Sequence, residues 1–404
     1  MPPPGDSGKH SAADRGMQPA QASATELSRA LLRDATEELA SCWDPFVAMD
    51  LSVAMLEAQK AGLDDLSPAD WFLSGLDALR NSGNLRPWLY RGAAQIGWTA
   101  TQLHRSLGLR MTNLQAIDEL ILAWINDYPA AEDAELLFGV AGLGAYGLDH
   151  VSPVLARRIV SGTLQVIGER LERSAEGSCV RLKAPRWDRP DASRRLGWRA
   201  VGVAHGNAGI ASFLASVVRS DLGLEDRAQL MLAEVARWLV SVASPDSVYV
   251  FDSYAEAGRR KGRSSWCHGD PGTALALASV ARALDDPQLA GQVQASSDMA
   301  ARAVLHRPVS LAGIVDCCLC HGAAFLCYFG QRVSHLGQRE AGSFASQWND
   351  YIRERRKDGR LLYQTSGEMS RDVSLLGGDS GVICALTRSV HRQPAAWERL
   401  LLVS

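Results

Sequence analysis

A short glycine pattern recurs along the chain and constrains its fold more than any other feature. It reads G-x-x-G, or a close variant, followed by an apolar run. Clear copies begin at Gly92, Gly139, Gly206, Gly269, Gly322 and Gly378, and a degenerate copy lies at 49–52. The variable intervals of about 43–67 residues fit helical hairpins with loops better than a solenoid of fixed period. Because glycine lets helices begin in a crowded place, the repeats predict an all-α fold, an α/α toroid of about seven hairpins.

The composition agrees with one helical domain. Of the 404 residues, 47% are hydrophobic and only 7% are aromatic, which is typical of a globular chain that favours helix over sheet. Residues 1–24 are rich in Pro, Gly, Ser and Gln without periodic apolar spacing, so we expect a disordered N-terminal tail there. Helical patterning starts near Thr25, and we expect residues 25–404 to form the toroid as a single domain.

Charge and missing motifs exclude several classes of function. The chain has 42 Lys and Arg against 45 Asp and Glu, so no excess of positive charge indicates nucleic-acid binding. No uncharged apolar run reaches the ~20 residues of a membrane span, and no apolar signal segment is visible, so we expect a cytoplasmic protein. Glycine-rich phosphate loops and a serine elbow are missing. A glycosidase needs paired carboxylates, for which Asp270 and Asp379 are the only hints at repeat starts.

Three consecutive repeats begin with a histidine directly before the glycine. They read Ala204-His205-Gly206, Cys267-His268-Gly269 and Cys320-His321-Gly322. If the repeats are structurally equivalent, these residues occupy equivalent places on three neighbouring inner helices. The sequence therefore predicts that two thiols and three imidazoles converge at one end of the ring.

Cysteine and histidine together indicate a zinc site, because thiolate sulfur and imidazole nitrogen suit this ion. The spacing leaves two kinds of site open. A closed structural site would use Cys267, His268, Cys320 and His321. A catalytic site would use three of these four residues and keep the fourth position open. Cys317 and Cys318 lie close enough to Cys320 in the sequence to be alternative ligands.

At these residues the sequence resembles the LanC-type lanthipeptide cyclases and their LanC-like relatives, from about residue 35 to the end. The most specific marks are Ser265-Trp266-Cys267-x-Gly269-x-Pro271-Gly272, Cys320-His321-Gly322, Ala204-His205-Gly206-x-Ala208-Gly209 and Ser374-Leu375-Leu376-x-Gly378. The resemblance implies an α/α toroid with Zn²⁺ at one end. The ligands that it implies are Cys267, Cys320 and His321, with water or substrate in the fourth position.

The resemblance also assigns further site residues and shows two departures. Arg263 and His205 match the family's arginine and histidine. His268 stands where the family usually has an aromatic residue such as Tyr, and Glu135 stands where it commonly has Asp. His268 is a spectator, a replacement proton donor or a fourth ligand that would close the site.

The reaction that the resemblance implies is thioether formation in a ribosomally made precursor peptide. A peptide Cys thiol adds to a dehydroalanine or dehydrobutyrine, giving lanthionine or methyllanthionine. Arg263 would stabilise the enolate, His205 would protonate the α-carbon with His268 as its rival, and Glu135 would orient His205. The expected partners are the dehydrated peptide, a separate dehydratase and a transporter complex, through which the protein would associate with a membrane.

Two other functions stay open at this point. LanC-like relatives add glutathione to dehydrated residues in proteins, and the same zinc site would serve that reaction. Alternatively, His268 closes the metal site, and the toroid is an inactive, zinc-stabilised scaffold for a peptide-modifying complex.

Overall fold

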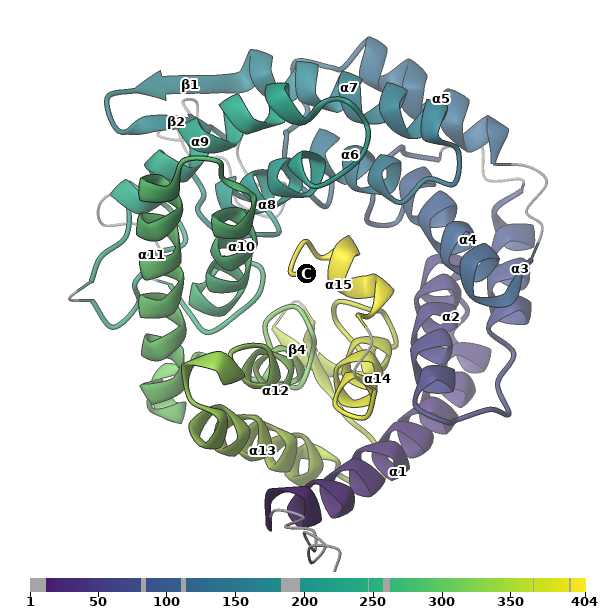
Figure 1. Cartoon of the computed structure of the whole chain (residues 1–404). Coiled ribbons are helices and arrows are strands. Elements are labelled where there is room, and N and C mark those ends of the chain that lie inside the picture. Colours follow the sequence, from purple (N-terminus) through teal and green to yellow (C-terminus); the bar gives the residue numbers. More distant parts are fainter. Residues whose placement is uncertain are drawn as a thin grey trace, which may run out of the picture.

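Two concentric rings of helices surround a common axis in the computed structural model (Figure 1). It describes residues 12–80, 85–109, 114–182, 197–245, 247–256, 262–365, 367–391 and 394–404. The inner ring consists of α2 (Pro45–Lys60), α4 (Ala93–Leu107), α6 (Val140–Leu148), α8 (Asn207–Val218), α10 (Asp270–Ala283), α12 (Ala323–Arg332) and α14 (Asp379–Arg388). The outer ring consists of α1 (Ala12–Ser41), α3 (Pro68–Leu79), α5 (Gln115–Asn126), α7 (Pro153–Arg170), α9 (Glu225–Ser241), α11 (Pro287–His306) and α13 (Gln338–Arg355).

Seven helix pairs therefore form the toroid within the described residues, which confirms the predicted fold class. Six inner helices pair with the outer helix that follows them in the chain. The seventh pair joins the two ends of the chain, because α14 packs against α1 and also against α2. The ring is thus closed by contacts between segments more than 300 residues apart.

The remaining elements are short. Two antiparallel hairpins pair β1 (Leu171–Ser174) with β2 (Gly177–Val180), and β3 (Tyr363–Thr365) with β4 (Glu368–Ser370). The 3₁₀ helices η2 (Val309–Leu311) and η3 (Ser334–Leu336) lie in connecting segments. No helix in the described part of the chain has both the length and the apolar character needed to cross a bilayer.

The N-terminal boundary differs from the one expected. Helix α1 begins at Ala12, inside the segment 1–24 that we expected to be a disordered tail, while residues 1–11 lie outside the described residues. Ala24 is buried, and Arg353 donates a hydrogen bond to Ser23 Oγ. The segment is rich in alanine, which has the highest helix propensity but adds little to an apolar pattern. Composition alone therefore placed the boundary too late.

All six clear glycine copies cap the N-termini of inner helices. The preceding loop folds back over the first helical turn, so a Cβ at Gly269 would lie 1.8 Å from Arg263 O. A Cβ at Gly272 would lie 2.2 Å from Trp266 O. Close backbone approach is therefore the reason for these glycines. The copy expected at 49–52 lies inside α2, which Asp44 caps instead.

Backbone hydrogen bonds connect the loops that precede neighbouring inner helices. We call this circle of loops the loop ring. Its bonds run from Tyr90 N to Leu137 O, Leu136 N to Ala204 O, Ala204 N to Cys267 O, Cys267 N to Cys320 O and Cys320 N to Leu376 O, at 2.9–3.4 Å. Residues far apart in the sequence are thereby fixed at equivalent places around the axis.

Side chains close the loop ring where α2 lacks a glycine-capped loop. Leu375 N donates to Asp50 Oδ2 at 2.9 Å, and Gln95 Nε2 donates to Asp50 Oδ1 at 2.8 Å. Arg91 N in turn donates to Gln95 Oε1 at 2.8 Å. Gln95 stands where four other inner helices carry the second glycine of the pattern, so this departure in sequence has a structural role.

The C-terminal segment fills the middle of the toroid. Helix α15 (Ala396–Leu400) lies near the axis, where the chain ends (Figure 1). Trp266 Nε1 donates to Leu401 O at 3.0 Å, and Ser212 Oγ donates to Leu402 O at 2.7 Å. The segment thus supports the loop ring from inside.

The two acidic residues at repeat starts are structural. Asp270 is fully buried and pairs with Arg307, and Asp379 is fully buried and pairs with Arg371 at 2.9 Å. Asp379 also accepts a hydrogen bond from Tyr363. Because both carboxylates are occupied by these partners, they do not form the pair that a glycosidase needs.

Candidate metal centre

The loops before α10 and α12 place two thiols side by side in the loop ring. Cys267 and Cys320 each stand two residues before a cap glycine, and both Trp266 N and Cys267 N donate to Cys320 O at 3.1 and 3.4 Å. His321 follows Cys320 directly. One donor atom from each of Cys267, Cys320 and His321 lies within 4.8 Å of the other two. The predicted metal ligands are therefore brought together by the fold.

Electrostatics favours a thiolate at this place. A hydrogen bond from Cys320 lowers the pKa of the Cys267 thiol well below its ordinary value, although burial raises it. His321 and Arg263 also lower the pKa of Cys267. Arg263 Nη2 donates to Cys267 Sγ at 3.3 Å, and Arg263 Nε donates to Ser265 Oγ at 3.2 Å. Negative charge on Cys267 is thus balanced by a neighbouring guanidinium.

These residues fit zinc in number, type and spacing. Tetrahedral Zn²⁺ with bonds of about 2.0–2.3 Å requires donor atoms roughly 3.5–4 Å apart, which the observed group satisfies with little movement. His268 is not part of this group among the described residues. Its ring instead stacks on His205, with centroids 5.3 Å apart. The geometry therefore favours three protein ligands over the closed Cys₂His₂ alternative.

A second, overlapping group leaves one alternative ligand set. Donor atoms of Asp316, Cys318 and His321 also lie within 4.8 Å of one another. Cys318 has a structural role as well, because its Sγ accepts a hydrogen bond from His321 N at 3.4 Å. Ser265 accepts the equivalent bond from His268 N at 3.3 Å in the loop before α10. Cys317 is buried and belongs to neither group.

A partly buried His205 and a buried Glu135 form a pair beside the thiols. His205 Nδ1 lies 2.7 Å from Glu135 Oε2, and Glu135 also accepts hydrogen bonds from the N–H groups of Leu137 and Phe138. Burial lowers the pKa of His205, but the Glu135 carboxylate outweighs it and the net pKa is raised. The Glu135 carboxylate therefore orients the His205 ring through Nδ1 and favours its protonated form.

Aromatic rings extend from this pair in both directions. His205 stacks between His268 and Phe138, whose ring centroid lies 6.2 Å away. The ring centroid of Tyr254 lies 5.9 Å from that of His268 and 4.7 Å from that of Trp198. Trp198 and Tyr254 were not predicted from the sequence, because no motif connects these two segments before the chain is folded.

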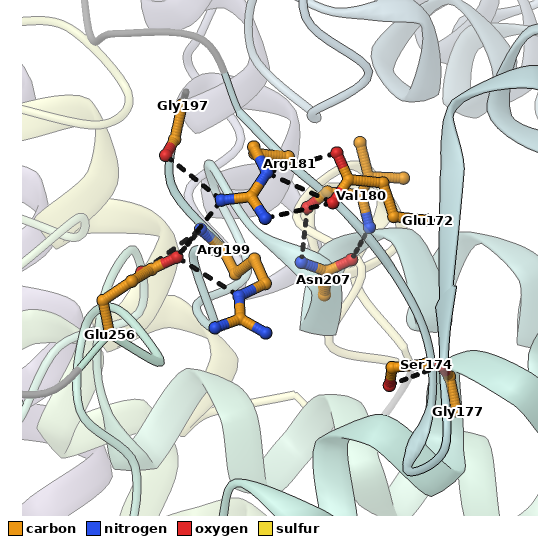
Figure 2. A network of polar contacts seen from close by, with 9 residues as sticks. All are labelled: Glu172, Ser174, Gly177, Val180, Arg181, Gly197, Arg199, Asn207 and Glu256. Carbon is orange, nitrogen blue, oxygen red and sulfur yellow. Dashed lines mark hydrogen bonds and ion pairs between the residues drawn. The ribbon is translucent and has the colours of Figure 1, made fainter. Parts of the chain in front are cut away.

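A polar network anchors the segment that leads to His205 (Figure 2). Asn207, the first residue of α8, accepts from Val180 N at 2.7 Å and donates to Val180 O and Ala200 O. Nearby, Arg199 N and Nε donate to Glu256 at 3.1–3.4 Å. The network joins β2 and the segment around Glu256 to the start of α8, two residues after His205.

The fold and the donor set together define the class: a helical toroid with a candidate thiolate–imidazole metal centre where its inner helices begin. Comparison with known proteins agrees with this class. A family model described as lanthionine synthetase C-like protein matches residues 51–402, so the chain belongs to this family.

Solved structures provide a second comparison. The structure of nisin cyclase superimposes with a TM-score of 0.65 at 16% identity, covering 92% of this chain and 97% of that one. A glycosyl hydrolase of family 88 from Bacteroides vulgatus gives a TM-score of 0.43 at 11% identity, covering 91% of this chain and 98% of that one. No curated protein sequence matches significantly.

Proposed function

We propose that the protein is a zinc-dependent cyclase that forms lanthionine and methyllanthionine rings in a ribosomally made precursor peptide. The observation that carries the proposal is the group of Cys267, Cys320 and His321 beside Arg263 and the His205–Glu135 pair. A peptide Cys thiol adds to the β-carbon of dehydroalanine or dehydrobutyrine. The thiol loses its proton, one C–S bond forms, the C=C bond becomes single, and the α-carbon takes up a proton.

Cys267, Cys320 and His321 would hold the metal and leave one position for the substrate sulfur. When bound, Zn²⁺ makes the substrate thiol a thiolate at neutral pH, where a free thiol with a pKa of about 8.5 is only a few per cent ionised. The protein contributes two sulfur donors of its own. With the metal bound, their electron density would help to keep the substrate sulfur nucleophilic.

Arg263 supplies positive charge next to the reacting sulfur. Addition to the dehydro residue develops negative charge on the carbonyl oxygen of an enolate. A guanidinium held 3.3 Å from Cys267 Sγ is already in the buried site when this charge appears. Removal of such a donor typically costs ~10²–10³ in kcat.

His205 donates the proton that completes the addition. Glu135 holds the ring at Nδ1 and raises the pKa of His205, which favours the protonated form. A protonated imidazole is a suitable acid for an enolate α-carbon. His268, stacked on His205 at 5.3 Å, is the second candidate for this proton transfer.

The reaction also defines the partners that we propose. Dehydrated Ser and Thr residues must be made by a separate dehydratase, with the cyclase acting on its product. We place this work in the cytoplasm, in a complex that includes the dehydratase and a transporter.

The test is ring formation by purified, zinc-loaded protein on a dehydrated precursor peptide. Cyclisation leaves the mass unchanged and removes thiols that an alkylating reagent would label. The expected result is loss of labelling that depends on zinc. Glutathione adducts on the dehydro residues without ring formation would instead indicate the glutathione-adding activity. A protein that binds zinc but catalyses neither reaction would support the scaffold function.

A further inference from the structure

Both metal-bearing loops carry a charged side chain at the same place, six residues before the cap glycine. In the loop before α10 this residue is Arg263, and in the loop before α12 it is Asp316. Arg263 Nη2 lies 3.3 Å from Cys267 Sγ, and Asp316 Oδ2 lies 4.0 Å from His321 Nε2. A cation thus faces the thiol, and a carboxylate faces the imidazole. The charge at this place complements the ligand of each loop.

The Asp316 carboxylate is buried and held firmly. Its side chain is 1% exposed. Oδ1 accepts from Cys318 N at 2.9 Å, and Oδ2 accepts from Gln364 N in β3 at 3.0 Å. Burying a carboxylate is costly unless it is well hydrogen-bonded. Two hydrogen bonds from backbone N–H groups fix its position, and a carboxylate has acceptor capacity left for a third partner.

The arrangement assigns different tasks to the two ring nitrogens of His321. Nε2 is the atom that faces Asp316, so Nδ1 is left for a metal. A neutral imidazole ligand carries its proton on the other nitrogen, and a carboxylate there fixes the tautomer and the ring orientation. The two atoms lie 4.0 Å apart, so the ring must turn toward the carboxylate to reach the ~2.7–2.9 Å of a charge-assisted hydrogen bond.

We propose that Asp316 is a positioning residue of the metal centre. Its carboxylate accepts the Nε2–H of His321 and aims Nδ1 at the ion. The β3–β4 hairpin is part of the same support, because Gln364 N holds Asp316 Oδ2. This proposal rests on the zinc centre of the proposed function and adds a residue that the motifs did not indicate.

The chain offers a matched control for the structural part of this role. Asp372 stands at the same place before α14, and its Oδ1 accepts from Ser374 N at 2.7 Å, as Asp316 Oδ1 accepts from Cys318 N. The loop before α14 has Gly377 where His321 stands. Asp372→Asn therefore changes the same kind of turn without affecting a ligand.

The experiment compares zinc affinity in wild type, Asp316→Asn and Asp372→Asn by competition with a chromogenic chelator. Urea unfolding of the metal-free proteins is measured in parallel. We expect Asp316→Asn to weaken zinc binding about 10–100-fold, and Asp372→Asn to bind like wild type. Unchanged affinity in Asp316→Asn, or equal weakening in both variants, would overturn the positioning role. A wild type that binds no zinc would refute the proposed function itself.

The wild type provides an independent measurement if Asp316→Asn does not fold. Zinc-loaded protein with ¹⁵N-labelled histidine reports which ring nitrogen carries the proton. We expect the His321 signal to show zinc on Nδ1 and a proton on Nε2 that exchanges slowly with water. Zinc on Nε2 would overturn the proposal, because Asp316 would then face the ligating atom.

Discussion

Two parts of the loop ring share one backbone arrangement and differ in their side chains. The metal half comprises the loops before α10 and α12, and the closing half comprises the loops before α14 and α4. Two residues before the cap glycine, the metal half has Cys267 and Cys320, whereas the closing half has Leu376 and Tyr90. The bond from Cys320 N to Leu376 O joins the two halves. The fold thus provides equivalent places, and the residue at each place decides whether it serves chemistry or packing.

The closing half is built around an apolar cavity of about 30 Å³. Leu89, Tyr90, Leu137, Leu375, Leu376 and Leu401 are among the residues that line it. Asp50 and Gln95 also line it, and they close the loop ring by hydrogen bonds. Substitutions in this half should therefore change stability, whereas substitutions in the metal half should change metal binding and catalysis.

The largest difference between the two halves, in zinc binding and in stability, is expected from Cys320→Ala and Leu376→Ala. Cys320→Ala removes one of three protein ligands, so zinc and cyclisation should both be lost while helical circular dichroism is retained. Leu376→Ala should retain zinc and lose about 2–5 kcal/mol of unfolding free energy. Zinc content and urea unfolding of both variants check this contrast. One zinc ion per chain in Cys320→Ala would contradict the assignment of Cys320 as a ligand.

Cys318→Ser sharpens this test of the ligand set. Serine is the residue at the same place in the loop before α10, where it accepts the His268 N–H. The substitution should therefore keep the loop and keep one zinc per chain. X-ray absorption at the zinc edge should show two sulfurs in both the variant and the wild type. Loss of one sulfur would place Cys318 in the ligand set instead.

Arg263→Gln should produce the next largest effect. The variant loses the charge beside Cys267 but keeps all three ligands, so kcat should fall ~10²–10³-fold with zinc content unchanged. Arg91→Gln is the control in the closing half, where Arg91 pairs with Asp44. Its kcat should stay close to that of wild type. Equal losses in both variants would mean that Arg263 acts through general charge only.

Glu135→Gln should change the pH dependence more than the maximal rate. Glu135 raises the pKa of His205 against the effect of burial, so its loss lowers that pKa. The acid form of His205 then disappears at lower pH, and the alkaline limb of the rate profile moves toward acid. For each pH unit by which the pKa of His205 falls, the protonated fraction at a fixed pH above that pKa falls about tenfold.

A matched variant separates this effect from loop damage. Ser374→Ala removes the bond from Gly377 N to Ser374 Oγ, which is 3.2 Å long and equivalent to the bond that Glu135 accepts from Phe138 N. Its pH profile should equal that of wild type. An unmoved alkaline limb in Glu135→Gln would assign the proton transfer to a group other than His205.

The toroid was predictable because its repeats carry a steric requirement that is visible in one sequence. The cap glycines avoid clashes at similar places in successive hairpins, and their spacing exposed six of the seven inner helices. The start of α2 was missed, since Asp44 caps it without a glycine. The extent of α1 was missed because its first turns are rich in alanine and polar residues.

The candidate site was predictable only where residues belong to a repeat. Equivalence of the repeats is enough to predict that Cys267, Cys320 and His321 lie together, as they do in the folded chain. Asp316 stands six residues before its cap glycine, as Arg263 does, but this shared spacing has no meaning without the loop geometry. Trp198 and Tyr254 lie outside the repeat pattern, so only folding brings Tyr254 beside His268 and Trp198 against Tyr254.

The smallest effect on the reaction is expected from Asp50→Asn in the closing half. Burial raises the pKa of Asp50 to about 7 from its ordinary value of 3.8, although the bond from Leu375 N opposes this. Between these two pH values the folded state keeps the proton and the unfolded state releases it. Stability therefore falls as pH rises through this window, by up to roughly 4 kcal/mol at full ionisation.

The asparagine variant has no such proton, so its unfolding free energy should depend less on pH between 4 and 7. Asn also accepts from Leu375 N, whereas turning the Gln95 amide toward its N–H₂ group would remove the acceptor of Arg91 N. Urea unfolding at several pH values measures the difference, and zinc content with cyclisation rate should match wild type. An unchanged pH dependence in the variant would show that Asp50 is ionised in the folded ring throughout this range. Loss of zinc would show that the two halves are coupled through the bond between Cys320 and Leu376.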